Sequence, residues 1–230
     1  MRKFIALILA LAFCLGLTVA LADTAVTVSG TGEILVPADT AMISIGITVR
    51  DQDALKAQSG ANEVIARIRE ALTGAGFDKE DINTGYISLY AVSDYSGDVE
   101  KITAYNASST LAVKVTDMAR VGEAVDLAFG AGANRLDGIS FSVSDDSAAR
   151  AEALKAAVAD AKAKAAVLAE AAGLSETEIV SIQEGSVSSY DSGVNNFSRK
   201  AAGMEMDSAT VVQAAKICVS ATVTVTFNAK

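Results

Sequence analysis

Few side chains in this sequence could carry out chemistry. The chain contains no histidine, which removes the commonest general base and the commonest transition-metal ligand. Cys218 is the only cysteine after residue 22, so the later chain cannot form a zinc site or a dithiol pair. No Gly-x-Ser-x-Gly, Ser-x-x-Lys or Gly-Lys-Ser/Thr motif occurs. We therefore expect no catalytic residues, no metal site and no cofactor, and a protein that is not an enzyme.

Oxidation is the one reaction for which candidate residues exist. Cys218 falls on the hydroxyl-bearing face of a predicted strand, with Lys216 on the same face. Met204 and Met206 fall in a polar stretch, where oxidation would not disturb a core. Free cysteines are usually buried, so an inert thiol is the simpler interpretation. A redox-protective protein acting through Cys218 or through Met204 and Met206 is the alternative function.

Tyrosines form the second group of candidate residues. Tyr86 and Tyr90 share one face of a predicted strand with Ser88, and Tyr105 falls on the strand that follows. Tyrosine suits half-buried interfaces, which makes Tyr86, Tyr90 and Tyr105 a candidate binding or subunit surface. Cross-strand packing explains the same pattern equally well.

Alternating apolar residues predict the strands that position these groups. They indicate seven strands, over about 26–36, 41–49, 82–95, 102–115, 139–143, 179–182 and 217–227. The last strand has an apolar face with Ile217 and Phe227 and an opposite face rich in hydroxyls. The polar stretch 186–208 predicts a loop.

Helical periodicity predicts three helices between the strands. The first begins near Asp53 and ends at Gly74 or Gly76, and the second follows Asp117. The longest is alanine-rich, begins at Asp146 or Ser147 and ends at Gly173. We expect its buried face to include six residues at helical spacing: Leu154, Val158, Ala161, Ala165, Leu168 and Ala172.

The order of these elements predicts an α+β fold. We expect a mixed, mostly antiparallel sheet or sheets packed by about three helices. Residues 23–230 would form a single domain, with a division into two subdomains, about 23–116 and 117–230, as a variant of this prediction.

The first 22 residues have the features of a secretory signal peptide. Arg2 and Lys3 precede an uncharged apolar run that ends at Ala20-Leu21-Ala22. We expect export to the periplasm or the cell exterior, without stable membrane insertion after cleavage. The net charge of −9 argues against nucleic acid as a partner, because phosphates require a basic surface.

Several segments resemble the SIMPL-domain family of exported bacterial proteins. The resemblance begins at Val28-Ser29-Gly30-Thr31-Gly32-Glu33 and covers nearly all of the chain after the signal segment. It continues through Pro37–Ala41, Asp81–Thr84, Tyr105–Ser108, Gly132–Asn134, Gly138–Val143, Ala171–Gly173 and Val219–Val225.

This resemblance implies an α+β fold, export and no general catalytic site. Some SIMPL-domain proteins form large ring-like or channel-like oligomers, and others are linked to envelope or oxidative-stress responses. We therefore expect an exported, non-enzymatic protein that forms a homo-oligomer in the envelope or outside the cell and has a role in the oxidative-stress response.

Overall fold

The structure is a computed structural model that describes residues 24–96, 99–174, 177–192, 210–214 and 216–230. Contacts divide the chain into two compact units, each built from separate stretches of sequence. One contains the stretch up to Gly32 with Leu154–Ser186 and Thr222–Lys230, and the other contains Glu33–Ala153 and Val187–Ala221. The predicted signal peptide lies outside the described residues.

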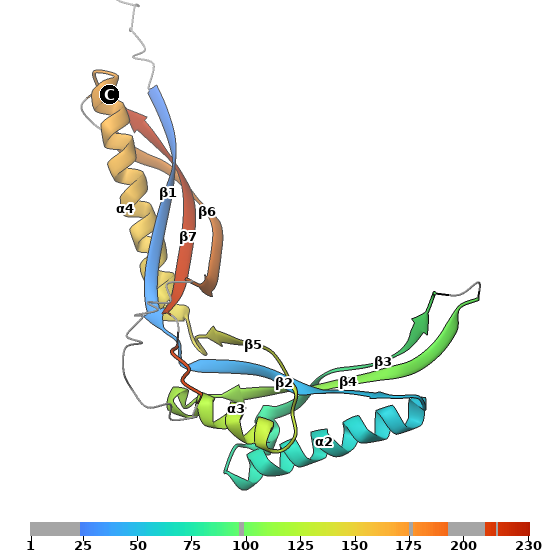
Figure 1. Cartoon of the computed structure of the whole chain (residues 1–230). Helices are drawn as coiled ribbons and strands as arrows, with labels where there is room; N and C mark the ends of the chain where they lie inside the picture. Colours follow the sequence, from blue (N-terminus) through green and yellow to red (C-terminus); the bar gives the residue numbers. More distant parts are fainter. Residues whose placement is uncertain (1–23, 97–98, 175–176, 193–209, 215) are drawn as a thin grey trace, which may run out of the picture. The chain divides into compact units, whose positions relative to one another are not determined.

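One sheet has three strands in the order β1-β7-β6, with β7 (Lys216–Ala229) in the centre. Its neighbours are β1 (Thr24–Pro37) and β6 (Thr177–Asp191). The alternation predicted for β7 is confirmed, because Ile217 and Phe227 are buried while Thr224 is exposed. Helix α4 (Ser147–Ala171) lies along this sheet (Figure 1).

The buried face of α4 confirms the predicted one only in part. Its buried stripe consists of six alanines: Ala149, Ala153, Ala157, Ala161, Ala165 and Ala169. Ala161 and Ala165 were predicted to be buried, whereas Leu168 is 49% exposed and Ala172 is exposed. Methyl groups let the helix approach the sheet so closely that a Cβ added to Gly30 of β1 would lie 2.0 Å from the Ala157 carbonyl oxygen. The predicted face also included three larger residues, Leu154, Val158 and Leu168, whereas close packing places only alanines against the sheet.

Helix α4 begins at Ser147, as predicted, and its C-terminal cap is also confirmed. At the helix start the carboxylate of Asp145, one residue before the predicted cap, accepts a 2.9 Å hydrogen bond from the Ser147 backbone N–H. At the other end Gly173 has a φ of 78°, and the Leu174 N–H donates to the Ala169 carbonyl at 2.9 Å. This is the Schellman geometry expected from the Gly-Leu pair.

The second sheet has four antiparallel strands in the order β3-β4-β2-β5. They are β2 (Thr40–Asp51), β3 (Ile82–Asp94), β4 (Lys101–Val115) and β5 (Arg135–Ser142). Pairing of β2 with β4 ends at Asp51 opposite Tyr105, but β3 and β4 stay paired as far as Asp94 opposite Lys101. The β3–β4 ribbon therefore extends beyond β2 (Figure 1).

Helices α2 (Ala54–Gly74) and α3 (Val121–Gly130) cover one face of this sheet (Figure 1). Asp53 caps α2 as predicted, because its carboxylate accepts hydrogen bonds from the N–H groups of Leu55 and Lys56. Short 3-10 helices cover Lys79–Asp81 and Met118–Arg120. The core joins the helices to alternate strand residues, including Ile43, Ile45, Ile68, Leu72, Leu111 and Val125.

The predicted order of strands and helices and the α+β class are confirmed. The loop predicted over 186–208 is wrong in its first part, because β6 continues to Asp191. The hydroxyl of Ser186 lies 3.2 Å from that of Thr222 on β7. Pairing with β7 thus extends β6 into a polar segment whose composition is typical of a loop.

Candidate functional site

The face of the four-stranded sheet opposite α2 and α3 carries a group of polar side chains that could bind a ligand. Strand register arranges them in three rows. Tyr90 lies opposite Asn106, which lies opposite Arg50; Ser88 lies opposite Ser108, which lies opposite Thr48. The third row is Tyr86, Thr110, Gly46 and Arg135.

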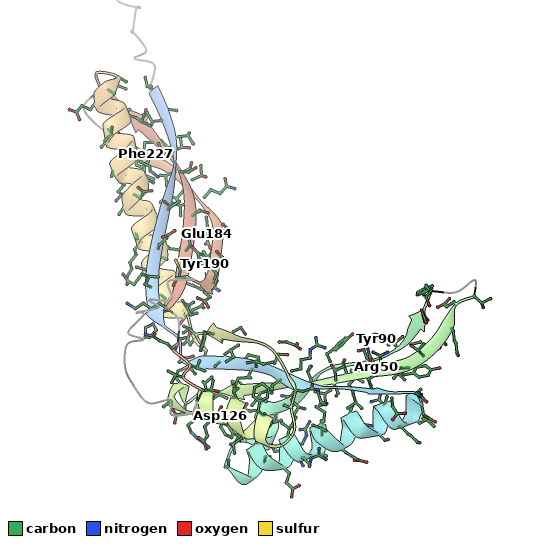
Figure 2. The ribbon with its side chains drawn as sticks, in the orientation of Figure 1. Arg50, Tyr90, Asp126, Glu184, Tyr190 and Phe227 are labelled. Carbon is green, nitrogen blue, oxygen red and sulfur yellow. The ribbon has the colours of Figure 1, made fainter. Side chains whose placement is uncertain are left out.

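We call these ten residues the tyrosine–arginine face. Tyrosines stand along β3 on one side, and arginines stand on β2 and β5 on the other (Figure 2, which labels Tyr90 and Arg50). Between them lie short hydroxyl side chains and Gly46. A Cβ at Gly46 would lie 2.0 Å from the Ser109 carbonyl oxygen, so the close approach of β2 to β4 at this position requires glycine.

The hydroxyls in the centre of the face are buried although no helix covers them. Ser108 is 3% exposed and Thr110 is 1% exposed. Ser108 Oγ lies 2.8 Å from Thr48 Oγ1, which satisfies buried polar groups.

Electrostatics link the two sides of the face. Arg135 pairs with Asp137, and its pKa is raised, first by the hydrogen bond and charge of Asp137 and further by Tyr86 and Tyr90. The Asn106 amide donates a 3.2 Å hydrogen bond to the Tyr90 hydroxyl. Arg50 is exposed and has no ion-pair partner among the described residues.

An amide group also protects the strand edge next to this face. Beyond the end of β5, the Asn134 side chain accepts a 2.9 Å hydrogen bond from the Thr48 backbone N–H and donates one of 3.0 Å to the Thr48 carbonyl. The amide occupies both main-chain groups that another strand would use. The tyrosine–arginine face is thus accessible from above but not by strand addition at Thr48.

The three candidate tyrosines do not form one surface. Tyr86 and Tyr90 are each 54% exposed on the tyrosine–arginine face. Tyr105 lies on the opposite face, where it packs against the helix-covered core. Since successive residues of a strand point to opposite faces, odd-numbered Tyr105 follows its buried neighbours Ala107 and Leu111.

The candidate redox residues are also separated from this face. Cys218 on β7 is buried and lies beside Tyr190 of β6. The pKa of Tyr190 is raised, first by a hydrogen bond with the Cys218 side chain and further by the nearby carboxylate of Glu33. Met204 and Met206 lie outside the described residues.

The described residues contain no cluster of three or more His, Cys, Asp or Glu side chains able to hold a metal ion. A cavity of about 670 Å³ between α2 and β3 is lined partly by Ile65, Arg69, Glu70, Lys79 and Ile87. Its lining combines charged side chains, hydroxyl groups and apolar surface.

Sequence reasoning missed the arginines of the face. Arg50 lies near the end of β2, and Arg135 begins β5, much later in the sequence. No local spacing therefore joins these two arginines. The strand register that places Arg135 opposite Gly46 arises from long-range pairing. The even-numbered positions of β2 and β4 carried the available signal, because they alternate with the apolar core residues.

Comparison with known families identifies one family over most of the chain. The family model of SIMPL, described as a protein of unknown function (DUF541), matches residues 26–227. The chain belongs to the SIMPL family. The segment Tyr105–Ser108, part of the SIMPL resemblance, contributes Asn106 and Ser108 to the tyrosine–arginine face.

Relatives of this SIMPL chain include two bacterial proteins. The chain is 31% identical over 164 residues to the 26 kDa periplasmic immunogenic protein of Brucella melitensis, a match that covers 69% of the chain and 66% of the relative. It is 27% identical over 144 residues to the uncharacterized protein YggE of Escherichia coli K12, covering 63% of the chain and 58% of that protein. The matches thus span less than two thirds of each relative's length.

In the part of the chain that the structure describes, none of the helices combines the length and the apolar character needed to span a membrane.

Proposed function

We propose that this SIMPL chain is an exported, non-enzymatic protein that assembles with copies of itself in the periplasm or outside the cell. The signal-like residues 1–22 support export, as does the word "periplasmic" in the name of the Brucella relative. The separation of the candidate chemical groups supports a non-enzymatic role. We propose further that the assembly is a component of the cell envelope. Its role in the oxidative-stress response is also part of the proposal.

The observation that carries the assembly proposal is the exposed β3–β4 ribbon. Beyond Asp51 no third strand among the described residues pairs with it. Three apolar side chains near its end are exposed: Tyr95 at 73%, Val99 at 79% and Ile102 at 51%. An isolated two-stranded ribbon is marginally stable in water. Burial of its apolar side chains against another copy would stabilise it and remove apolar surface from water.

Light scattering on the mature chain, residues 23–230, tests this proposal. At tens of micromolar protein we expect a mass above that of the monomer. Val99→Asp with Ile102→Asp should reduce the mass towards the monomer, because charges would be forced into the contact. Val167→Asp is the matched control, since Val167 on α4 is 65% exposed and belongs to a different element from the ribbon. A monomeric wild type, or a ribbon variant with unchanged mass, contradicts the proposal.

The alternative function, redox protection, also remains a proposal. Burial of Cys218 beside Tyr190 weakens the support for a thiol that reacts directly, because reactive thiols are accessible thiolates. Survival of peroxide treatment by cells carrying Cys218→Ser together with Met204→Leu and Met206→Leu tests it. Loss of protection would favour this alternative over a purely structural role.

A further inference from the structure

The tyrosine–arginine face combines three kinds of recognition group that no assembly contact requires. Tyr86 and Tyr90 lie four residues apart on β3, about 13 Å along the strand. Arg50 lies two strands from Tyr90, about 10 Å across the sheet. The half-exposed tyrosine rings therefore lie on one side of a row of amide and hydroxyl groups, and the exposed guanidinium of Arg50 lies on the other.

This combination matches the chemistry of a sugar chain. A sugar ring has an apolar C–H face, which packs on an aromatic ring, and a rim of hydroxyls, which both donate and accept hydrogen bonds. Tyr86 and Tyr90 offer the rings, and Asn106 and the nearby hydroxyls offer both donors and acceptors. The separation of the tyrosines accommodates a chain of more than one sugar ring.

The charges on this face indicate which class of sugar chain it suits. The chain carries a net charge of −9, but the row Tyr90–Asn106–Arg50 contains no acidic residue. Asp137 is already paired with Arg135, which leaves the Arg50 guanidinium available. A guanidinium binds a carboxylate with two parallel hydrogen bonds, so an anionic sugar suits this row better than a neutral one.

The main chain argues against an extended peptide at the same place. A peptide that adds to a sheet takes its affinity from main-chain hydrogen bonds at an edge. Across this face the main-chain groups between β3 and β4 and between β4 and β2 are paired, and Asn134 occupies the β2 edge at Thr48. The outer edge of β3 has no partner strand among the described residues, so a peptide added there would lie beside the face and would not cross the row Tyr90–Asn106–Arg50. A ligand that crosses this row meets only side chains, as in the binding of a glycan.

From these observations we propose that the tyrosine–arginine face binds an acidic oligosaccharide, with sugar rings on Tyr86 and Tyr90 and a carboxylate on Arg50. The site lies on the opposite face of the sheet from α2 and α3 and does not include the apolar end of the ribbon. Binding is therefore independent of the assembly proposed above, and either proposal can fail without the other.

Isothermal titration calorimetry of the mature chain with hexagalacturonate tests the proposal. Cellohexaose, which lacks carboxylates, and a hexaglutamate peptide, which lacks sugar rings, are the comparison ligands. We expect hexagalacturonate to bind more tightly than either. Arg50→Gln should weaken this binding about tenfold, because a charge-assisted hydrogen-bonded pair is lost. Tyr90→Ala should weaken it about fivefold, whereas Tyr90→Phe should retain most of it.

Matched variants separate local binding from general effects. Arg67→Gln removes an exposed arginine from α2, and Phe129→Ala removes an exposed aromatic side chain from α3; both should bind like the wild type. Thermal melting verifies that each variant is folded. The proposal is overturned if hexagalacturonate does not bind, if Arg50→Gln and Tyr90→Ala bind it unchanged, or if hexaglutamate binds as tightly and loses affinity with the same variants.

Discussion

The carboxylate of Asp160 on α4 accepts a 2.8 Å hydrogen bond from the backbone N–H of Thr31 on the edge strand β1. One turn later, Lys164 donates to the Ser29 carbonyl at 3.1 Å and to the same Asp160 carboxylate at 2.6 Å. Two helix side chains thus occupy the main-chain groups of β1 that another strand would use. Covered edges of this kind prevent uncontrolled strand addition.

Removal of the Asp160 carboxylate should open the β1 edge. We expect Asp160→Ala to lower the melting temperature by a few degrees and to increase aggregation on heating, because the Thr31 N–H loses its acceptor and Lys164 loses its partner. Asp160→Asn should have a smaller effect, since its amide oxygen still accepts from Thr31. Differential scanning fluorimetry with simultaneous light scattering measures both quantities. Equal behaviour of the two variants would show that the hydrogen bond to Thr31 does not protect the edge.

Gly30 should be the glycine least tolerant of a side chain in the α4-covered sheet. A Cβ at this position would lie 2.0 Å from the Ala157 carbonyl and 2.9 Å from the Ala161 methyl. We expect Gly30→Ala to reduce the free energy of unfolding by about 1–3 kcal/mol, the usual cost of overpacking. Urea denaturation measures this change.

Gly74→Ala is the matched control for Gly30→Ala. Gly74 ends α2, and a Cβ there would meet no atom within 4 Å. Because alanine restricts the unfolded chain, we expect a gain of about 0.5 kcal/mol. A loss of similar size in both variants would attribute the Gly30 effect to glycine replacement in general and contradict close packing against α4.

The contrast between these glycines shows what the sequence could predict. Caps at Asp53 and Gly173 depend on neighbouring residues, and alternation in β7 depends on one strand, so local patterns were sufficient. The buried side of α4 depends on how closely the helix approaches Gly30, which is a long-range property. Likewise, the β3–β4 register places Tyr86 and Tyr105 on opposite faces of the sheet. Arg50 shares a row with Tyr90 only because β2 and β3 both pair with β4.

Asp146 should make stability depend on pH in the acid range. Its pKa is lowered from 3.8 to about 2, first by the hydrogen bond from Arg150 and then by that from Ser189. Because the folded-state pKa lies below the unfolded one, the ionised carboxylate stabilises the fold above about pH 4, and this contribution is lost as the pH falls towards 2. Asp146→Asn should therefore be less stable than the wild type at pH 7.

Urea denaturation at several pH values tests this behaviour of Asp146. The difference in unfolding free energy between wild type and Asp146→Asn should shrink steadily between pH 4 and pH 2. Glu63→Gln, a substitution on the exposed side of α2, serves as the control and should show no such trend. A difference that stays constant over the acid range would mean that the carboxylate charge does not contribute.

The Cys218 thiol should react slowly while the chain is folded. The residue is 4% exposed and its side chain is hydrogen-bonded to Tyr190, so a reagent gains access only when β6 and β7 separate locally. We expect labelling by a chromogenic disulfide to be much slower in buffer than in denaturant. Tyr190→Ala should accelerate labelling of the folded chain, whereas Tyr95→Ala at the ribbon should not. Native labelling as fast as in denaturant would show an accessible thiol and would favour the redox-protective function over assembly alone.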